Sequence, residues 1–214
     1  DKEAFIKSKC FISGLPVRYF RQKNILNLSL HQSNPLLFLS MNLYRGNLSN
    51  FNGYLTDVNK AKFEKDLILN GLSKLSYRVA YKPYPTENLR YPDHDPTIRY
   101  IKKFKNIDLY DKRQDARYLF AKHKIIICTG ASSTLSWAIM SGKPIVLINC
   151  PFQSPLSSEA MIPMKDSLFL FDYSDKNFFK NFKSFFCKNI SEIEELYYNK
   201  KSKRESMIEN FFSS

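Results

Sequence analysis

Cysteine and histidine are scarce in this chain of 214 residues, which contains four cysteines and three histidines. The cysteines show no paired spacing, so a disulfide framework is excluded, and the scattered histidines make a zinc site unexpected. No Asp-x-Asp metal motif stands at a convincing position, so we predict a protein without a bound metal. Cys128 and Cys150 end apolar segments and are expected to be reduced core thiols of a cytoplasmic protein.

Long apolar runs are also missing. No segment approaches the length that spans a bilayer, and no signal-peptide pattern opens the sequence. The first residue is Asp1 rather than Met, which suggests a fragment or a processed chain. With 43% hydrophobic residues, the chain has enough apolar side chains for one good-sized core. We therefore expect a cytoplasmic protein, with peripheral contact to the inner face of the membrane as an alternative.

Acidic residues are few relative to basic ones, and the formal net charge is +13. Residues 36–135 alone carry +8 of this excess. Such a charge is typical of proteins that bind nucleic acid, an anionic membrane surface or a polyanionic small substrate. Because the sequence has no nucleic-acid motif and its basic residues are spread through predicted helices, we predict no nucleic-acid partner. A biased genomic base composition is a further explanation for the many lysines.

The most informative stretch is Ile125–Ile148, which predicts a strand, a tight turn, a short helix and a second strand. Its first residues, Ile125–Ile127, are typical of a strand buried on both faces of a parallel sheet. Ser132–Thr134 provide N-cap residues, and Gly142 ends the helix. Backbone N–H groups, three hydroxyls and the helix dipole converge at this turn and indicate an anion-binding site. Ordinary helix capping is the alternative explanation.

Several other segments have the pattern of strands and alternate with helices. This alternation predicts an α/β fold, a Rossmann-like parallel sheet with helices on both faces, together with remnants of a second domain. We expect residues 1–35 to end a preceding domain or linker. Residues 36–174 would form the Rossmann-like domain, and residues 175–214 the C-terminal helices that pack on it or on its partner. The other predicted strands are Leu36–Met41, Tyr77–Tyr81, Ile107–Tyr110 and Leu168–Phe171.

The predicted helices differ in how clearly they are patterned. The helix after Asp57 has Val58 and Ile68 on its expected buried face, with Lys60 and Glu64 expected to face solvent. Residues 111–122 are predicted to form another helix, and residues 190–212 one long amphipathic helix. Residues 149–163, which include Glu159, are predicted to form a loop.

Polar side chains follow three of the predicted strands. Right-handed crossovers bring the carboxyl ends of parallel strands to one edge, where open α/β sheets bind ligands. The loop after the first strand contains Asn42 and Arg45, and the second strand leads into Lys82-Pro83-Tyr84-Pro85, whose prolines fix an extended exit. This convergence favours ligand binding over simple capping. The residues expected to meet at the edge are Arg45, Lys82, Tyr84, Gly130 and Ser132–Thr134.

The order of these motifs resembles the C-terminal, donor-binding half of a GT-B glycosyltransferase. It is similar in particular to bacterial capsule and surface-polysaccharide transferases that use CMP-Kdo or CMP-sialic acid, and to CDP-glycerol glycerophosphotransferases. Those families carry a Lys-Pro-His-Pro element and a Ser-Ser or Ser-Thr element, both of which contact the phosphate and sugar of the nucleotide. Here the elements are Lys82-Pro83-Tyr84-Pro85 and Ser132-Ser133-Thr134. Tyr84 replaces the histidine, a departure that puts a phosphate-binding or leaving-group role at this position in doubt. The similarity covers roughly residues 36–172.

The resemblance implies a transferase that moves a sugar from a nucleotide-sugar donor to a glycan or lipid-linked acceptor, with no cofactor besides the donor. Lys82 would be the catalytic cation that stabilises the leaving phosphate in place of a metal. The base for the acceptor hydroxyl would lie in a missing N-terminal domain or a partner subunit. The implied phosphate-binding residues are Lys82, Tyr84, Gly130, Ser132, Ser133 and Thr134. The implied sugar or nucleotide contacts are Asn42, Arg45 and Glu159, although Glu159 fits a helix-capping carboxylate equally well.

Two other functional classes remain open. A sugar-nucleotide 2-epimerase shares the GT-B architecture, and a non-catalytic domain that binds a nucleotide or a partner fits the short length. The end of the chain is rich in aromatic residues interspersed with lysines. Phe178, Phe182 and Phe185 share one helical face and are expected in the core. The remaining aromatics would contact an anionic membrane surface or, as a slightly favoured alternative, the missing N-terminal domain.

Overall fold

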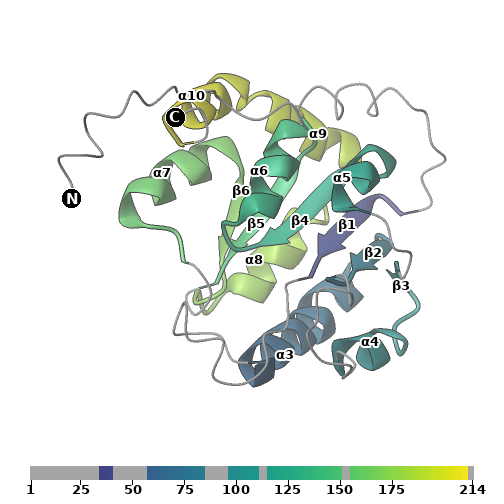
Figure 1. Cartoon of the computed structure of the whole chain (residues 1–214). Coiled ribbons are helices and arrows are strands. Elements are labelled where there is room, and N and C mark those ends of the chain that lie inside the picture. The colour runs from purple at the N-terminus through teal and green to yellow at the C-terminus, as the bar shows by residue number, and fades with distance from the viewer. Residues whose placement is uncertain (1–33, 41–56, 85–95, 111–114, 151–154, 212–214) are drawn as a thin grey trace.

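The computed structural model describes residues 34–40, 57–84, 96–110, 115–150 and 155–211 (Figure 1). Within these ranges the chain forms a six-stranded parallel sheet with the strand order β3-β2-β1-β4-β5-β6. The predicted α/β fold class is therefore confirmed. Asn42 and Arg45, for which sugar or nucleotide contacts were predicted, lie outside the described residues.

All six predicted strands are present, with ends that differ from the prediction by only one or two residues. They are β1 (Leu36–Leu39), β2 (Val79–Lys82), β3 (Ile107–Leu109), β4 (Ile125–Thr129), β5 (Ile145–Asn149) and β6 (Phe169–Asp172). The α-helices are α3 (Asp57–Asp66), α4 (Pro96–Ile101), α5 (Ala116–Leu119), α6 (Ser133–Met140), α7 (Ser158–Ser167), α8 (Phe178–Phe185), α9 (Ile190–Tyr198) and α10 (Lys201–Phe211). A π-helical turn at Leu67–Gly71 extends α3, and 3-10 turns follow at Leu72–Lys74 and Phe120–Lys122.

The central strands are buried on both faces, which explains why they read as continuous apolar runs rather than alternating ones. Every residue of β1, β4 and β5 is buried. Successive side chains enter two separate clusters, Ile125 and Ile127 on one face and Ile126 and Cys128 on the other. Burial raises the pKa of the Cys128 thiol to about 12, so this cysteine is an unreactive core residue.

Helices cover both faces of the sheet, as predicted. In Figure 1, α3, α4 and α8 lie below the sheet, and α5, α6, α7 and α10 lie above it. The first set packs on the cluster that contains Phe38 and Ile127, and the second on the cluster that contains Leu39 and Cys128. Two separate apolar layers therefore hold the carboxyl edge of the sheet in place.

Helix α3 is oriented differently from the prediction. Val58 is 61% exposed, whereas the side chains of Lys60 and Glu64 are 1% and 0% exposed and form an ion pair. The buried side of the helix runs through positions 60, 63, 64 and 67, a regular helical stripe in which two positions are charged. The buried position predicted for Ile68 is confirmed, since this residue is 0% exposed. The prediction was wrong for Lys60 and Glu64 because it assigned every charged residue to solvent, which is the usual outcome for unpaired charges.

Other helix predictions need smaller corrections. Within the described part of the expected helix over residues 111–122, which begins at residue 115, the chain forms one turn of α-helix, Ala116–Leu119, followed by a 3-10 turn. The expected long helix over 190–212 is two helices, α9 and α10, which are separated at residues 199–200. Glu159 lies in the first turn of α7 rather than in a loop.

Most of the C-terminal aromatic residues belong to the core of the domain itself. Phe178, Phe182 and Phe186 are 0–3% exposed and pack with the partly buried Phe171 and Phe185. Each fully buried aromatic side chain contributes about 1.5–3 kcal/mol. The core positions predicted for Phe178 and Phe182 are confirmed.

Most of the described aromatic side chains that were predicted to contact a membrane are buried or partly buried in the domain. Phe179 is partly buried and Tyr197 is fully buried, while Tyr198 remains 54% exposed. Phe212 lies outside the described residues. Contact of this segment with a membrane therefore stays a prediction that rests mainly on its lysines.

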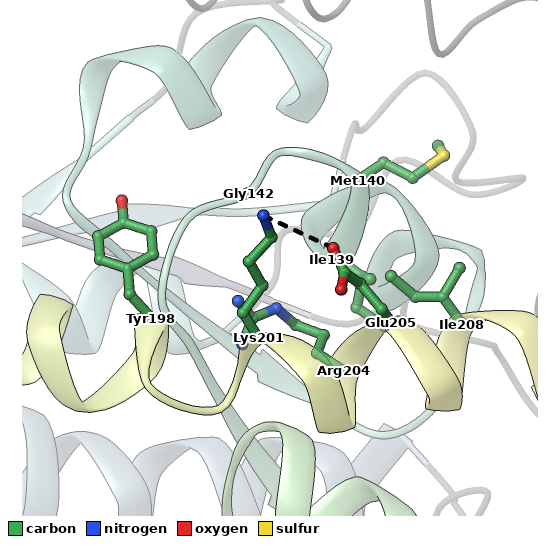
Figure 2. Close-up of a pocket in the computed structure, with 8 residues that line it drawn as sticks. All are labelled: Ile139, Met140, Gly142, Tyr198, Lys201, Arg204, Glu205 and Ile208. Carbon is green, nitrogen blue, oxygen red and sulfur yellow. Dashed lines mark ion pairs between the residues drawn. The ribbon is translucent and has the colours of Figure 1, made fainter.

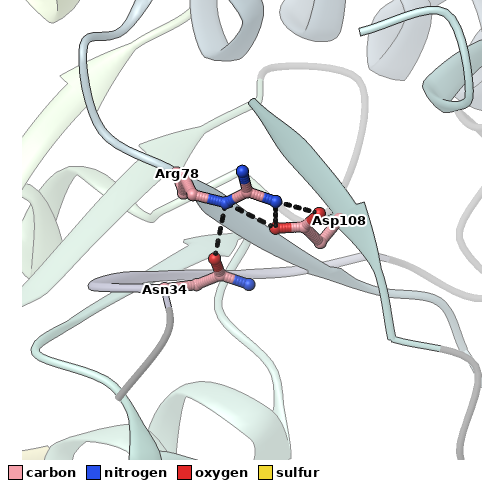
Figure 3. Close-up of polar contacts among 3 residues, drawn as sticks. All are labelled: Asn34, Arg78 and Asp108. Carbon is pink, nitrogen blue, oxygen red and sulfur yellow. Dashed lines mark hydrogen bonds and ion pairs between the residues drawn. The ribbon is translucent and has the colours of Figure 1, made fainter. Parts of the chain in front are cut away.

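At the amino edge of the sheet, hydrogen bonds between polar side chains connect the starts of neighbouring strands (Figure 3). Arg78, just before β2, donates to both carboxylate oxygens of Asp108 on β3 at 2.6–3.1 Å and to Oδ1 of Asn34 at 3.3 Å. The main-chain carbonyl of Asn34 accepts a hydrogen bond from Nδ1 of His123, just before β4, at 2.8 Å. Asn34 therefore links the starts of β1, β2 and β4.

His123 makes the stability of this edge sensitive to acid. Burial lowers the pKa of His123, the hydrogen bond to Asn34 opposes that effect, and Lys122 and Lys143 lower the pKa further. Because the unfolded chain protonates at the usual pKa near 6.5, it binds more protons than the folded state below that pH. We expect the free energy of unfolding to fall as the pH drops below about 6.5. Denaturant titrations across this window should show a shallower pH dependence for His123→Gln than for the wild type, and equal slopes would contradict the assignment.

Candidate functional site

The carboxyl edge of the sheet contains a topological switch point between β1 and β4. The connection after β1 runs through α3 to one face, whereas the connection after β4 runs through α6 to the other. In open α/β sheets the crevice outside such a point is where ligands bind. The residues that border it are Ser40 after β1 and Gly130 after β4.

The turn between β4 and α6 is built to leave the helix start open. Gly130 has φ of 81°, a conformation that a residue with a Cβ avoids, and its N–H donates to the Ile148 carbonyl at 3.1 Å. Ser132 occupies the N-cap position with an extended backbone, but its exposed side chain makes no capping hydrogen bond. Ser132 therefore does not cap the helix through its side chain. Helix α6 is long enough to have the positive end of a helix dipole at this terminus.

Lys82 lies on the same face of the sheet as α6. It is the last residue of β2, its side chain is 6% exposed, and its Cα is in register with that of Leu39, which is in register with Cys128. Registered residues of parallel strands point to the same face, and Leu39, Cys128 and the α6 residue Leu135 share one apolar cluster. Strands are about 4.8 Å apart, so the ends of β2 and β4 are separated by about 10 Å.

Sequence reasoning missed two aromatic side chains at this site. The ring of Tyr110, which follows β3, lies 5.7 Å from Nζ of Lys82. On the other side, the guanidinium of Arg117 lies 4.9 Å from the ring of Trp137 on α6 and pairs with Asp115 at 2.5 Å. These contacts add a second cation near α6. The available signal was an aromatic residue at the end of a predicted strand, which did not distinguish Tyr110 from a core residue.

Of the residues predicted to bind the sugar or nucleotide, only Glu159 lies in the described part of the chain. Asn149, the last residue of β5, accepts a hydrogen bond from the Leu156 N–H at 3.0 Å and donates to Asp172 at 3.1 Å, which fixes the approach to α7. Ser157 caps α7, and Glu159 is exposed in its first turn. Tyr84 is partly buried after β2. The roles proposed for Glu159 and Tyr84 remain predictions.

A cavity of about 560 Å³ lies elsewhere, between the C-terminal end of α6 and α10 (Figure 2). Its lining includes Ile139, Ile208 and the Lys201–Glu205 ion pair, whose charged atoms are 3.7 Å apart. Arg204 also contributes, but it already donates to the carbonyls of Ser167 and Tyr197 and stacks on the Tyr197 ring. The cavity is about 12 Å from the start of α6, the length of the helix, and does not belong to the candidate site.

No group of three or more His, Cys, Asp or Glu residues in the described ranges is arranged to hold a metal ion. Among the described helices, none is long and apolar enough to cross a bilayer.

Comparison with known proteins gives a structural match only. No protein-family model and no curated protein sequence matches the chain. The chain is similar to the spinosyn forosaminyltransferase SpnP, with a TM-score of 0.50 and 14% identity over 91% of this chain and 42% of SpnP. The fold is one half of a GT-B architecture.

Two further structural similarities are weaker. MurG of Acinetobacter baumannii gives a TM-score of 0.42 with 10% identity over 92% of this chain and 48% of MurG. The wall teichoic acid polymerase TagF gives 0.40 with 12% identity over 91% and 43%. The chain thus spans less than half of each of these GT-B proteins. The GT-B fold expected from the sequence is confirmed, whereas donor and acceptor are not identified by it.

Proposed function

We propose that this chain is the donor-binding domain of a glycosyltransferase, and that it binds the phosphate of a nucleotide-activated sugar at the start of α6. The observation that carries the proposal is the helix start beside the switch point, where Gly130 turns the chain and the Ser132 side chain does not cap the backbone N–H groups of the first turn. The buried Lys82 on the same face adds a positive charge. Hydrogen-bond donors, a helix dipole and a cation suit a phosphate group.

The same arrangement suits the transfer reaction. Breaking a sugar–phosphate bond develops negative charge on the nucleotide phosphate, and fixed donors in a partly dehydrated site stabilise that charge as it forms. A lysine side chain together with a phosphate group covers the separation of about 10 Å between the ends of β2 and β4. In this scheme Lys82 is catalytic, Ser132, Ser133 and Thr134 bind phosphate, and no metal is needed.

The finer assignments are parts of the proposal that the motifs of the sequence support. CMP- or CDP-linked donors of surface-polysaccharide synthesis are favoured, with a glycan or lipid-linked acceptor and a carboxylate base outside this chain. Asn42, Arg45 and Glu159 contact the sugar or nucleotide, and Tyr84 the phosphate. A lipid-linked acceptor would bring the protein to an anionic membrane. The competing functions are a sugar-nucleotide 2-epimerase and a non-catalytic nucleotide-binding domain.

Thermal unfolding in the presence of nucleotide sugars separates these functions. A ligand present at 100 times its dissociation constant stabilises the folded state by about 2.7 kcal/mol. We expect CMP-Kdo, CMP-sialic acid or CDP-glycerol to raise the melting temperature. A rise with UDP-GlcNAc alone would favour the epimerase, and no rise with any nucleotide sugar would contradict nucleotide binding.

A single hydroxyl at the helix start should affect binding and not folding. Ser132→Ala removes an exposed hydroxyl that makes no capping bond, so we expect little change in the free energy of unfolding. Loss of one hydrogen bond to a charged phosphate should weaken nucleotide affinity by about 1–2 kcal/mol, and Ser133→Ala is expected to do the same. Isothermal titration and denaturant unfolding measure the two quantities.

Asn189 provides a matched control for this prediction. Its side chain does cap a helix, accepting from the Glu192 N–H at 2.7 Å at the start of α9. Asn189→Ala should therefore lower stability by about 1 kcal/mol and leave nucleotide affinity unchanged. If Ser132→Ala instead lowers stability as much and affinity not at all, Ser132 is an ordinary cap.

A further inference from the structure

A buried polar group lies directly beneath the ends of β1 and β2, with the carboxylate of Glu64 at its centre. Oε1 of Glu64 accepts from the Ser40 hydroxyl at 2.7 Å. Oε2 accepts from the Tyr81 hydroxyl at 2.5 Å and pairs with Nζ of Lys60 at 2.9 Å. Because Tyr81 gives its only hydroxyl hydrogen to Glu64, the Thr97 hydroxyl 3.1 Å away donates to Tyr81.

The carboxylate of Glu64 and the ammonium of Lys60 form a buried ion pair. Glu64 and Lys60 are 0% and 1% exposed, and Tyr81 and Thr97 are fully buried. A buried carboxylate is tolerated when a cation and hydrogen-bond donors satisfy its oxygens, and here both oxygens are satisfied. A group held this firmly is unsuited to act as a proton acceptor for a substrate, so we exclude Glu64 as the transferase base.

The position of the group gives it a different role. Two residues of the group adjoin the candidate site. Ser40 borders the switch point, and Tyr81 immediately precedes Lys82. The Ser40 N–H also donates to the main-chain carbonyl of Lys82 at 2.9 Å. Through Ser40, the carboxylate of Glu64 is therefore two hydrogen bonds away from the backbone of Lys82.

We propose that Glu64, with Lys60, is a positioning residue of the donor site that fixes the end of β1 against the end of β2 and thereby sets the location of Lys82. This inference rests on the proposed function of Lys82 and extends it to residues on α3 that never touch the donor. Lys82 is at the last ladder position of β2, where the strand would otherwise fray. The hydrogen bonds of Ser40 hold that position from the neighbouring strand.

Amide hydrogen exchange tests the positioning without any ligand. In Ser40→Ala the bond to Glu64 is lost, and the amide of residue 40 should exchange at least about tenfold faster because its bond to the Lys82 carbonyl opens more often. The amide of Gly130, bonded to Ile148, should keep its rate. Thr97→Val is the matched control, since it removes the outermost bond of the same group and leaves Ser40 bound to Glu64. An unchanged rate at residue 40 overturns the proposal.

A double-mutant cycle on nucleotide affinity tests the link to Lys82. Ser40→Ala should weaken binding of the stabilising nucleotide sugar about tenfold in the wild type and less than about twofold in a Lys82→Ala background. Equal effects in both backgrounds would mean that Ser40 does not act through Lys82, which overturns the positioning role. If the wild type binds no nucleotide sugar, the proposed function fails, and the exchange result alone then reports whether the strand ends are held.

Discussion

Replacing Lys82 with alanine is expected to lower turnover by about 10²–10³-fold, as the loss of one fixed donor to a developing charge does in other enzymes. The Michaelis constant for the donor should rise far less, because the interaction strengthens as the sugar–phosphate bond breaks. Steady-state kinetics with the nucleotide-sugar donor as the varied substrate measure both constants.

Lys82→Met separates charge from packing in this experiment. The methionine keeps an aliphatic stem beside Tyr110, which lies 5.7 Å from the ammonium group. If the charge is responsible, the methionine variant should be as slow as the alanine variant, and both should unfold at nearly the wild-type denaturant concentration. A fall in turnover matched by an equal rise in the Michaelis constant, or no change in either, would show that Lys82 does not stabilise the transition state.

The second large effect concerns stability and the buried ion pair of α3. Glu64→Leu leaves Lys60 buried without its carboxylate, so we expect the free energy of unfolding to fall by about 3–5 kcal/mol. Removing both charges in Lys60→Met/Glu64→Leu should recover most of this loss, because a buried pair is often replaced by apolar residues at little cost. Urea titrations measure the difference in the free energy of unfolding, provided that its slope against urea concentration is the same for all variants.

Lys62 is the control for this pair, because it lies on the same helix and is exposed. Lys62→Met should change the free energy of unfolding by less than about 0.5 kcal/mol. A loss of the same small size in Glu64→Leu would show that water reaches Lys60 in solution. The double variant also probes the positioning role, since it should be stable and still bind nucleotide sugars more weakly than the wild type.

The strands of this protein were determined by local sequence. Ile125–Ile127 and Ile145–Ile148 are continuous β-branched and apolar runs, and such runs are stable only where both faces of a strand are covered. Gly130 and Gly142 then mark turns because their φ values of 81° and 71° suit glycine. The alternation of these runs with helices fixed the α/β class, and the parallel order brought Lys82 and Ser132 to one edge.

The tertiary structure alone decided which charged residues are inside. Lys60 and Glu64 are ordinary surface residues by helical pattern, and their burial depends on Ser40, Tyr81 and Thr97, which come from other elements. Likewise, the aromatic side chains of α8 were equally compatible with a membrane until β6 provided Phe169 and Phe171 as partners. A sequence pattern records the hydrophobicity of each residue, whereas satisfaction of a buried charge depends on atoms from distant segments that only the folded chain brings within hydrogen-bond distance.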